Sequence, residues 1–134
     1  MHPIKIKYEG NLRCVVTDPV NNQNVTTDGP VAQGGREEYM SPTDLFAISL
    51  ATCMATMMGM QANASKIDLS GMTMEVTKAF SAGKPMRVGA IVIVFEMPKG
   101  IDEHHQELLK KSTLGCPIHN SLHPDMAIDT KYIW

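Results

Sequence analysis

Two of the three cysteines stand where neighbouring residues could make a thiol reactive. Cys116 directly precedes Pro117, which suits the first turn of a helix, and the free N–H groups and dipole at a helix start lower the pKa of a nearby thiol. Cys53 lies in a long uncharged stretch, so its thiolate needs a cation from elsewhere. Arg36 is the only arginine near that stretch, and Asp44 could hold it through a charge-assisted fork. These residues predict a thiol-based redox site, although two cysteines so far apart can also be unrelated core thiols.

A metal centre is an alternative use of the same region. Cys116, His119, His123 and Asp125 lie close together, but zinc sites usually show four tightly spaced ligands and nothing completes this set. Four methionines crowd Met54–Met60; they suit a copper site, but unbranched side chains also fill irregular gaps in a core. We therefore predict no metal and no cofactor, and we interpret the two histidines as surface or interface residues.

The helix that must carry Cys53 is strongly indicated. Ser41 can cap it, Pro42 suits its first position, and Asp44 completes a capping box. No charged residue occurs from Leu45 to Ser65, and apolar side chains point in every direction around the helix. Such a helix is enclosed on all sides, in a core or in a membrane. Its hydroxyl and amide side chains, and the acidic flank Glu37–Glu38, favour a core helix over a membrane span.

The remaining elements alternate between strands and short helices. Ile4–Tyr8 and Leu12–Thr17 predict a hairpin, and the nearly all-apolar Val88–Met97 predicts a central strand. The other expected elements are strands at Val25–Thr27, Met72–Phe80 and Met126–Trp134, a helix through Glu103–Lys111 capped by Asp102, and a helix start at Cys116–Pro117. The segment Gln33–Arg36 is expected to be a flexible approach to the central helix. The fold class is α+β with antiparallel sheet.

Composition bounds the remaining possibilities. The chain has 134 residues, which predicts a single domain over residues 1–134. Its net charge of -2 and the lack of clustered Lys and Arg argue against nucleic acid as a partner. The start of the sequence lacks the apolar run of a signal peptide, so we expect a cytoplasmic protein with reduced thiols.

Two segments resemble the OsmC/Ohr family. SPTDLFAISLATCMATM is similar to that family's central helix, which carries its reactive cysteine, and GCPIHNSL is similar to its second-cysteine segment. The GGR before the helix and the order of strands also fit, so the resemblance covers essentially the whole chain. It implies an OsmC-like fold, with antiparallel sheets wrapped around central helices in an intertwined homodimer.

The resemblance also implies an activity, the thiol-dependent reduction of organic hydroperoxides. Cys53 matches the peroxidatic cysteine, Cys116 the resolving cysteine and Arg36 the arginine that activates the thiolate. The reductant would be an external dithiol or thiol, with no cofactor. One departure concerns the family's acidic residue, because its position in the hydroperoxide branch is Thr43 here and the acid follows one step later as Asp44.

A non-enzymatic homologue that binds a small apolar ligand at the dimer interface is the alternative function. Cys14, on an edge hairpin, is interpreted as a packed thiol. The homodimer is expected on physical grounds as well, because a helix that is apolar all round needs cover on more than one side, and a single sheet supplies only one.

Overall fold

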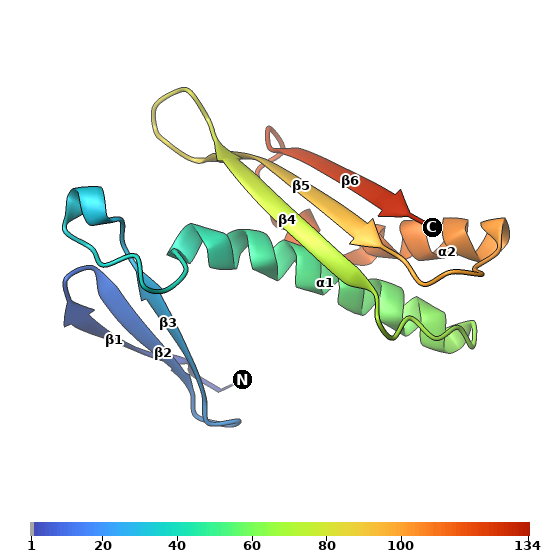
Figure 1. Ribbon diagram of the computed structural model, residues 1–134, viewed down its shortest axis with the longest axis horizontal. Helices are drawn as coiled ribbons and strands as arrows, with labels where there is room; N and C mark the ends of the chain where they lie inside the picture. Colours follow the sequence, from blue (N-terminus) through green and yellow to red (C-terminus); the bar gives the residue numbers. More distant parts are fainter. Residues whose placement is uncertain (1) are drawn as a thin grey trace. The chain divides into compact units, whose positions relative to one another are not determined.

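The computed structural model describes residues 2–134 and is an α+β fold with two three-stranded sheets. The chain divides into two compact units, one ending at Leu45 and the other spanning Phe46–Trp134. Its elements, labelled in Figure 1, are β1 (Lys5–Gly10), β2 (Arg13–Asp18), β3 (Gln23–Asp28), α1 (Pro42–Ala64), β4 (Thr73–Phe80), β5 (Val88–Glu96), α2 (Glu103–Ser112), α3 (Pro117–Asn120) and β6 (Ala127–Ile133). Two 3-10 turns cover Val31–Gln33 and Thr113–Gly115. The α+β prediction is confirmed, whereas the single-domain assignment stays a prediction.

The first unit is built on the antiparallel sheet β1-β2-β3, here called sheet A. The predicted hairpin is present, and Asn11 and Leu12 form its turn with positive φ angles. The register pairs Ile6 with Val16 and Tyr8 with Cys14, so these four side chains share one face. Ile6 and Tyr8 are 67% and 61% exposed, which leaves an apolar face of sheet A uncovered in the described chain.

The segment between sheet A and α1 is ordered, and the prediction of a flexible approach is wrong. After the 3-10 turn, Gly35 donates its N–H to the carbonyl of Pro30, and Gly29 donates to Leu12 of the hairpin turn. At the far end of the segment, the N–H of Asp28 donates to the carbonyl of Met40. The glycines that suggested flexibility instead permit close packing, because a Cβ on Gly35 would lie 1.9 Å from the carbonyl oxygen of Gly29.

α1 begins with the predicted capping box. The Ser41 hydroxyl accepts the N–H of Asp44, and the Asp44 carboxylate accepts the N–H of Ser41. One face of α1, including the fully buried Leu50 and Met58, packs on the second sheet. α1 is long and apolar enough to cross a membrane, but this packing is that of a core helix.

The expectation that α1 is enclosed on all sides does not hold for the single chain. Phe46, Thr52, Thr56 and Met60 are exposed along one stripe of the helix. The two threonine hydroxyls donate to the backbone carbonyls of Ile48 and Thr52, so they are satisfied within the helix itself. The two hydroxyl groups of the exposed stripe therefore do not depend on water as a hydrogen-bond acceptor.

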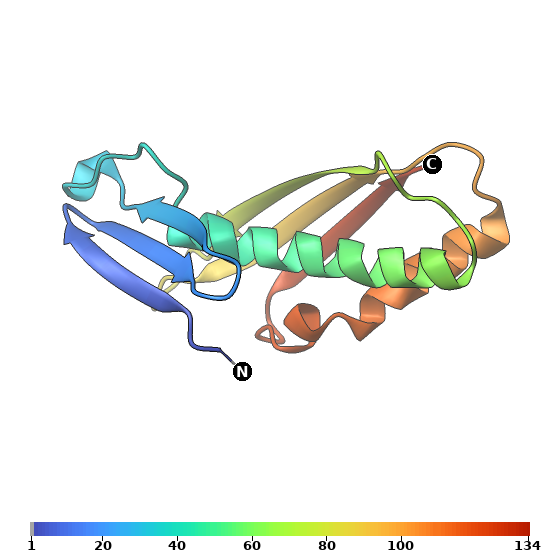
Figure 2. The ribbon, with the colours of Figure 1, turned by 90° about the horizontal axis from the view of Figure 1, so that it is seen from below.

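The second unit contains sheet B, in the order β4-β5-β6, with β5 central as predicted. Figures 1 and 2 show α1 and α2 on the same side of this sheet. Ile91, Ile93 and Phe95 of β5 are completely buried and form the core with α1. β6 runs parallel to β5, which corrects the expectation of purely antiparallel sheet. The long connection through α2 and α3 returns the chain to the end of the sheet where β5 began, and such a crossover produces a parallel pair.

Candidate thiol site

Cys53 lies on α1 within the exposed stripe, seven residues after Phe46 and seven before Met60. It is half-buried and packs against the core cluster that includes Leu50 and Met54. Its sulfur therefore sits beside apolar side chains but remains partly accessible. A helix in the middle of a unit is a rigid support, so the backbone holds this thiol in a fixed direction.

Cys116 is held by a turn whose backbone groups are largely hydrogen-bonded. Its N–H donates to the carbonyl of Thr113, and its carbonyl accepts the N–H of Asn120 in α3. Thr113 is itself buried, and its hydroxyl donates to the carbonyl of Lys110 at the end of α2. Cys116 is the N-cap of α3, as the Cys–Pro dipeptide predicts, and its sulfur accepts the N–H of His119 at 3.4 Å. This turn places the Cys116 thiol completely inside the core.

The two thiols share one core, since Cys53 packs against the buried cluster that contains Cys116 and contributes to the raised pKa of Cys116. None of the three cysteines forms a disulfide within the described chain, and Cys14 is half-buried on sheet A. The sequence prediction that the helix start lowers the pKa of Cys116 is wrong. Burial raises the pKa of Cys116, and the neighbouring Cys53 thiol raises it further, whereas the N–H groups of His119 and Ile118 oppose this only in part. α3 has a single turn, so it offers little dipole to compensate for the desolvation.

Met57 is a site residue that sequence reasoning did not single out. It follows Cys53 by one helical turn, and its terminal methyl lies 3.0 Å from the place where a Cβ of residue 115 would be. Gly115 immediately precedes Cys116, so Met57 joins α1 to the turn that carries the second thiol. The sequence holds a signal for this contact, a glycine next to a candidate cysteine, which can mark a close approach.

Arg36 lies in the first unit, in the ordered loop between sheet A and α1, and its side chain is exposed. Beside it is a network that sequence reasoning missed. Arg13 holds the buried Asp28 in a two-point fork, Nε to Oδ1 at 2.7 Å and Nη2 to Oδ2 at 2.8 Å, and its Nη2 also bonds Glu38 at 2.6 Å. The fork and the Glu38 and Tyr39 N–H groups lower the pKa of Asp28 to about 2. The register of β2 and β3 places Arg13 directly opposite Asp28. This pair of opposite charges on facing strands was the sequence signal for the network.

Asp44 serves α1 directly through the capping box. Its Oδ2 accepts the Ser41 N–H at 2.9 Å, and Thr43 Oγ1 lies 3.0 Å from the Ser41 hydroxyl. The proposed fork between Arg36 and Asp44 stays a prediction.

The histidines near Cys116 have different surroundings. His119 contributes its backbone N–H to the thiol, whereas the exposed His123 ring lies 3.3 Å from Arg87 Nη1 and 3.8 Å from Asp125 Oδ2. Among the described residues, no three His, Cys, Asp or Glu side chains gather as metal ligands would.

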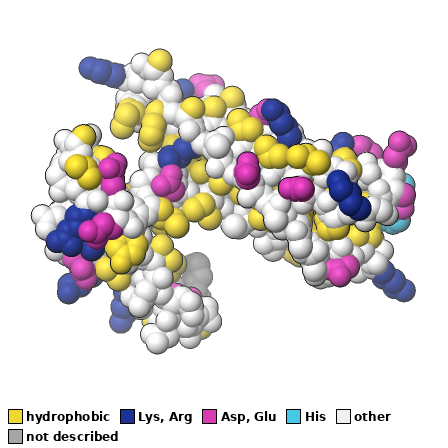
Figure 3. All heavy atoms as spheres, viewed as in Figure 1, with side chains coloured by type: hydrophobic (Ala, Val, Ile, Leu, Met, Phe, Trp, Pro, Cys, Tyr) yellow, Lys and Arg dark blue, Asp and Glu magenta, His cyan; other side chains and the backbone are white. Residues whose placement is uncertain are grey.

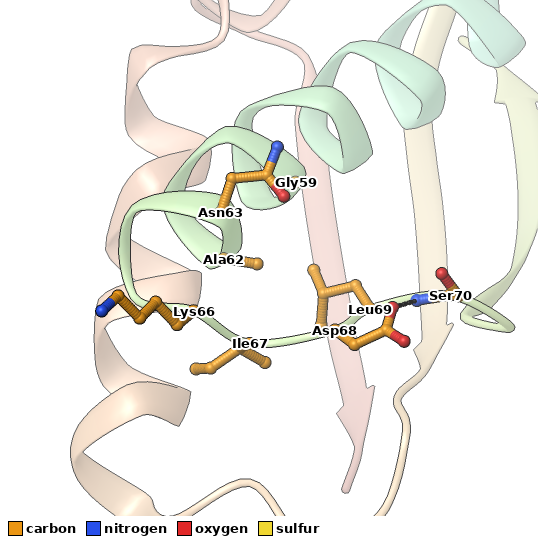
Figure 4. A pocket seen from close by; sticks show the side chains of 8 residues that line it. All are labelled: Gly59, Ala62, Asn63, Lys66, Ile67, Asp68, Leu69 and Ser70. Atoms are coloured by element: carbon orange, nitrogen blue, oxygen red, sulfur yellow. Dashed lines mark hydrogen bonds between the residues drawn. The ribbon is translucent and has the colours of Figure 1, made fainter.

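A shallow pocket of about 480 Å³ opens elsewhere in the second unit, where α1 ends (Figure 4). Its lining combines the last turns of α1 with the following segment, Lys66–Ser70. Neither Cys53 nor Cys116 contributes to it, so the thiol pair does not depend on this pocket.

The structure thus defines an α+β protein with a buried thiol held against a more accessible one. The family model described as OsmC-like protein matches residues 34–131. A protein from Psychrobacter arcticus 273-4, described among osmotic stress induced and detoxification response proteins, is 37% identical, with a TM-score of 0.93 over 98% of this chain and 96% of that one. This chain belongs to the OsmC-like family, so the resemblance seen in the sequence is confirmed.

Two more distant structures share the fold. An organic hydroperoxide resistance protein, OsmC, from Legionella pneumophila is 19% identical, with a TM-score of 0.77 over 100% of this chain and 98% of that one. An OsmC-like protein of unknown function from Vibrio cholerae is 11% identical, with a TM-score of 0.83 over 99% of each chain. No curated protein matches this sequence.

Proposed function

We propose that this protein reduces organic hydroperoxides with Cys53 and Cys116, taking electrons from an external dithiol or thiol. The main observation behind the proposal is that the half-buried Cys53 packs against the core cluster that contains the fully buried Cys116, within one unit. Membership of the OsmC-like family supports it, as does the name of the Legionella structure, an organic hydroperoxide resistance protein.

The proposed reaction begins at Cys53. Its thiolate attacks the terminal oxygen of the hydroperoxide, the O–O bond breaks, and the alcohol leaves after taking up a proton, so that Cys53 becomes a sulfenic acid. The sulfur of Cys116 then attacks the sulfur of Cys53, and the hydroxyl leaves as water with the proton that Cys116 carried. An external dithiol reduces the resulting disulfide through a mixed disulfide and is itself oxidised.

The different surroundings of the two thiols support this order of roles. The more accessible Cys53 can meet a substrate, whereas Cys116 is completely buried and its raised pKa keeps its proton in place at neutral pH. The apolar side chains that pack with Cys53 suit an alkyl hydroperoxide better than hydrogen peroxide. Arg36 is proposed to stabilise the Cys53 thiolate, because a thiolate beside apolar groups needs a positive charge.

We also infer that the protein works as a homodimer. Apolar residues on sheet A, Ile6 and Tyr8, are exposed, and so are Phe46 and Met60 on α1. Figure 3 shows hydrophobic side chains at the surface of both units. Fully burying one large apolar side chain stabilises by roughly 1.5–3 kcal/mol, so covering these faces with a second copy is strongly favourable.

The activity is tested by peroxide consumption with dithiothreitol as the external dithiol. Wild type should consume cumene hydroperoxide faster than hydrogen peroxide, Cys53→Ser should be inactive, and Cys14→Ser should match wild type as the control. A wild-type rate no greater than that of Cys53→Ser would exclude the enzyme and favour the ligand-binding alternative.

A further inference from the structure

One buried residue, Thr113, joins the turn that carries Cys116 to the end of α2. The backbone N–H of Thr113 donates to the carbonyl of Lys110, and its hydroxyl donates to the same carbonyl at 2.7 Å. On its other side, the carbonyl of Thr113 accepts the N–H of Cys116 at 3.1 Å. Thr113 is 7% exposed, so water competes little for these bonds and each counts for more than it would at the surface.

The end of α2 is in turn anchored on sheet B. The ammonium of Lys110 lies 5.7 Å from the centroid of the Tyr132 ring and 6.0 Å from that of Trp134. These two rings stack on each other, and Tyr132 also stacks on the fully buried Phe95 of β5, with ring centroids 5.1 Å apart. The carbonyl that accepts the Thr113 hydroxyl therefore belongs to a residue that β5 and β6 hold in place.

The support on the other side of Cys116 is much smaller. The carbonyl of Cys116 accepts the N–H of Asn120, and its sulfur accepts the N–H of His119, but both partners belong to α3, which has four residues. A helix this short is not stable by itself, so its position depends on the segment before it. The bond from Cys116 to Thr113 leads instead to α2, a helix of ten residues.

The position of Cys116 matters because disulfide geometry is specific, with the two sulfur atoms about 2.0 Å apart in the product. We propose that Thr113 is a positioning residue, whose hydroxyl bond to Lys110 holds Cys116 where its sulfur can attack Cys53. This inference rests on the proposed function, in which Cys116 resolves the oxidised Cys53. Thr113 acts through Cys116, by preorganising the turn before the attack.

Two substitutions separate the hydroxyl of Thr113 from its packing. Thr113→Val keeps the size of the side chain but removes the hydroxyl, whereas Thr113→Ser keeps the hydroxyl but removes a methyl group. Ser112→Ala is the matched control, because the Ser112 hydroxyl makes the same kind of bond one residue earlier, to the carbonyl of Leu109 at 2.6 Å. All variants are made in a Cys14→Ser background, which leaves two cysteines.

Stopped-flow reaction with dithionitrobenzoate measures disulfide closure without any peroxide. The Cys53 thiolate displaces one thionitrobenzoate and forms a mixed disulfide. The thiol of Cys116 then gives its proton to the buffer, its sulfur attacks the sulfur of Cys53, and the second thionitrobenzoate leaves. The first release therefore measures the reactivity of Cys53, and the second measures the attack by Cys116.

Only the second release should depend on Thr113. In Thr113→Val the first release should keep its wild-type rate and the second should slow about fivefold, the effect of losing about one hydrogen bond. Thr113→Ser and Ser112→Ala should show wild-type rates for both releases. A role in packing alone predicts the reverse order, with Thr113→Ser slower than Thr113→Val.

A second pair of variants tests the anchor if Thr113→Val does not fold. Lys110→Met keeps the backbone carbonyl and the apolar stem but removes the cation from the Tyr132 and Trp134 rings, so the second release should slow about threefold. Lys110→Arg keeps a cation over the rings and should restore most of the rate. A wild-type second release in Lys110→Met would overturn the anchoring through α2.

The remaining outcomes separate the positioning role from the proposed function. A wild-type second release in Thr113→Val would overturn the positioning role, and so would slower closure in Thr113→Ser or equal slowing in Ser112→Ala. Release of a single thionitrobenzoate by the wild-type pair would overturn it as well. If closure instead follows the expected order but cumene hydroperoxide leaves no sulfenic acid on Cys53 in Cys116→Ser, the peroxide reductase activity is excluded and the positioning of the two thiols stands.

Discussion

Gly115→Ala tests whether Met57 sets the approach of the two thiols. A Cβ at residue 115 would lie 3.0 Å from the Met57 methyl, whereas carbon atoms in contact normally stand about 3.5–4.0 Å apart. The contact must therefore open by roughly 0.5 Å or more. The backbone at Gly115 is not left-handed, so alanine brings steric crowding without backbone strain.

The expected cost is small and specific. Overpacking typically destabilises by about 1–3 kcal/mol, and the low end applies because the methionine side chain can adjust. About 1 kcal/mol would lower Tm by about 3–5 °C in a chain of this size. If the same energy opposes the approach of Cys116 to Cys53, disulfide closure should slow about fivefold.

Two assays and a second variant test this reasoning. Thermal unfolding gives the stability change, and stopped-flow reaction with cumene hydroperoxide separates sulfenic acid formation, which should be unchanged, from disulfide closure, which should slow. Met57→Leu shortens the side chain at nearly constant volume, so adding Gly115→Ala to it should cost much less. Equal effects of Gly115→Ala in both backgrounds would refute the contact as the cause.

Three further predictions follow from the site and the exposed faces. Because the pKa of Cys116 is raised in the folded protein, the contribution of this thiol to stability is present below the ordinary thiol pKa and is lost at higher pH. The free energy of unfolding of wild type, measured by urea titration, should therefore fall above about pH 8.5. The free energy of unfolding of Cys116→Ala should not show this fall. Arg36→Met should slow the alkylation of Cys53, and Arg36→Lys should restore the rate only in part; an alkylation rate identical to that of wild type would remove Arg36 from the mechanism. Sedimentation at low micromolar concentration should show only dimer, with a Tm that rises with protein concentration; a folded monomer there would contradict the homodimer.

The elements were predictable because their signals are local. Capping residues mark the start of α1, alternation marks the strands, and the Cys116–Pro117 dipeptide marks α3, so each could be inferred from a few neighbouring residues. The direction of β6 could not be predicted, because the alternation of apolar and polar residues is the same in parallel and antiparallel strands. It depends on where the connection from β5 delivers the chain.

The sequence was sufficient to single out the two thiols of the candidate site, but not to predict the pKa of Cys116. Cys53 and Cys116 were singled out from their surroundings, and the structure packs Cys53 against the core cluster that contains Cys116, while their catalytic roles stay predictions. The pKa of Cys116 was predicted in the wrong direction, since burial in the tertiary fold outweighs a one-turn helix. The ion pair between Arg13 and Asp28 was missed because the two residues become neighbours only through the strand register.

The most direct measurement of the central claim is a thiol count after one equivalent of cumene hydroperoxide. Reduced wild type should lose two thiols per chain, and peptide mass spectrometry should find one disulfide joining Cys53 to Cys116, with Cys14 still reduced. Cys116→Ser should lose one thiol and leave a sulfenic acid on Cys53 that dimedone traps. An unchanged thiol count in wild type, or a dimedone adduct on Cys116 in Cys53→Ser, would contradict the proposed reaction.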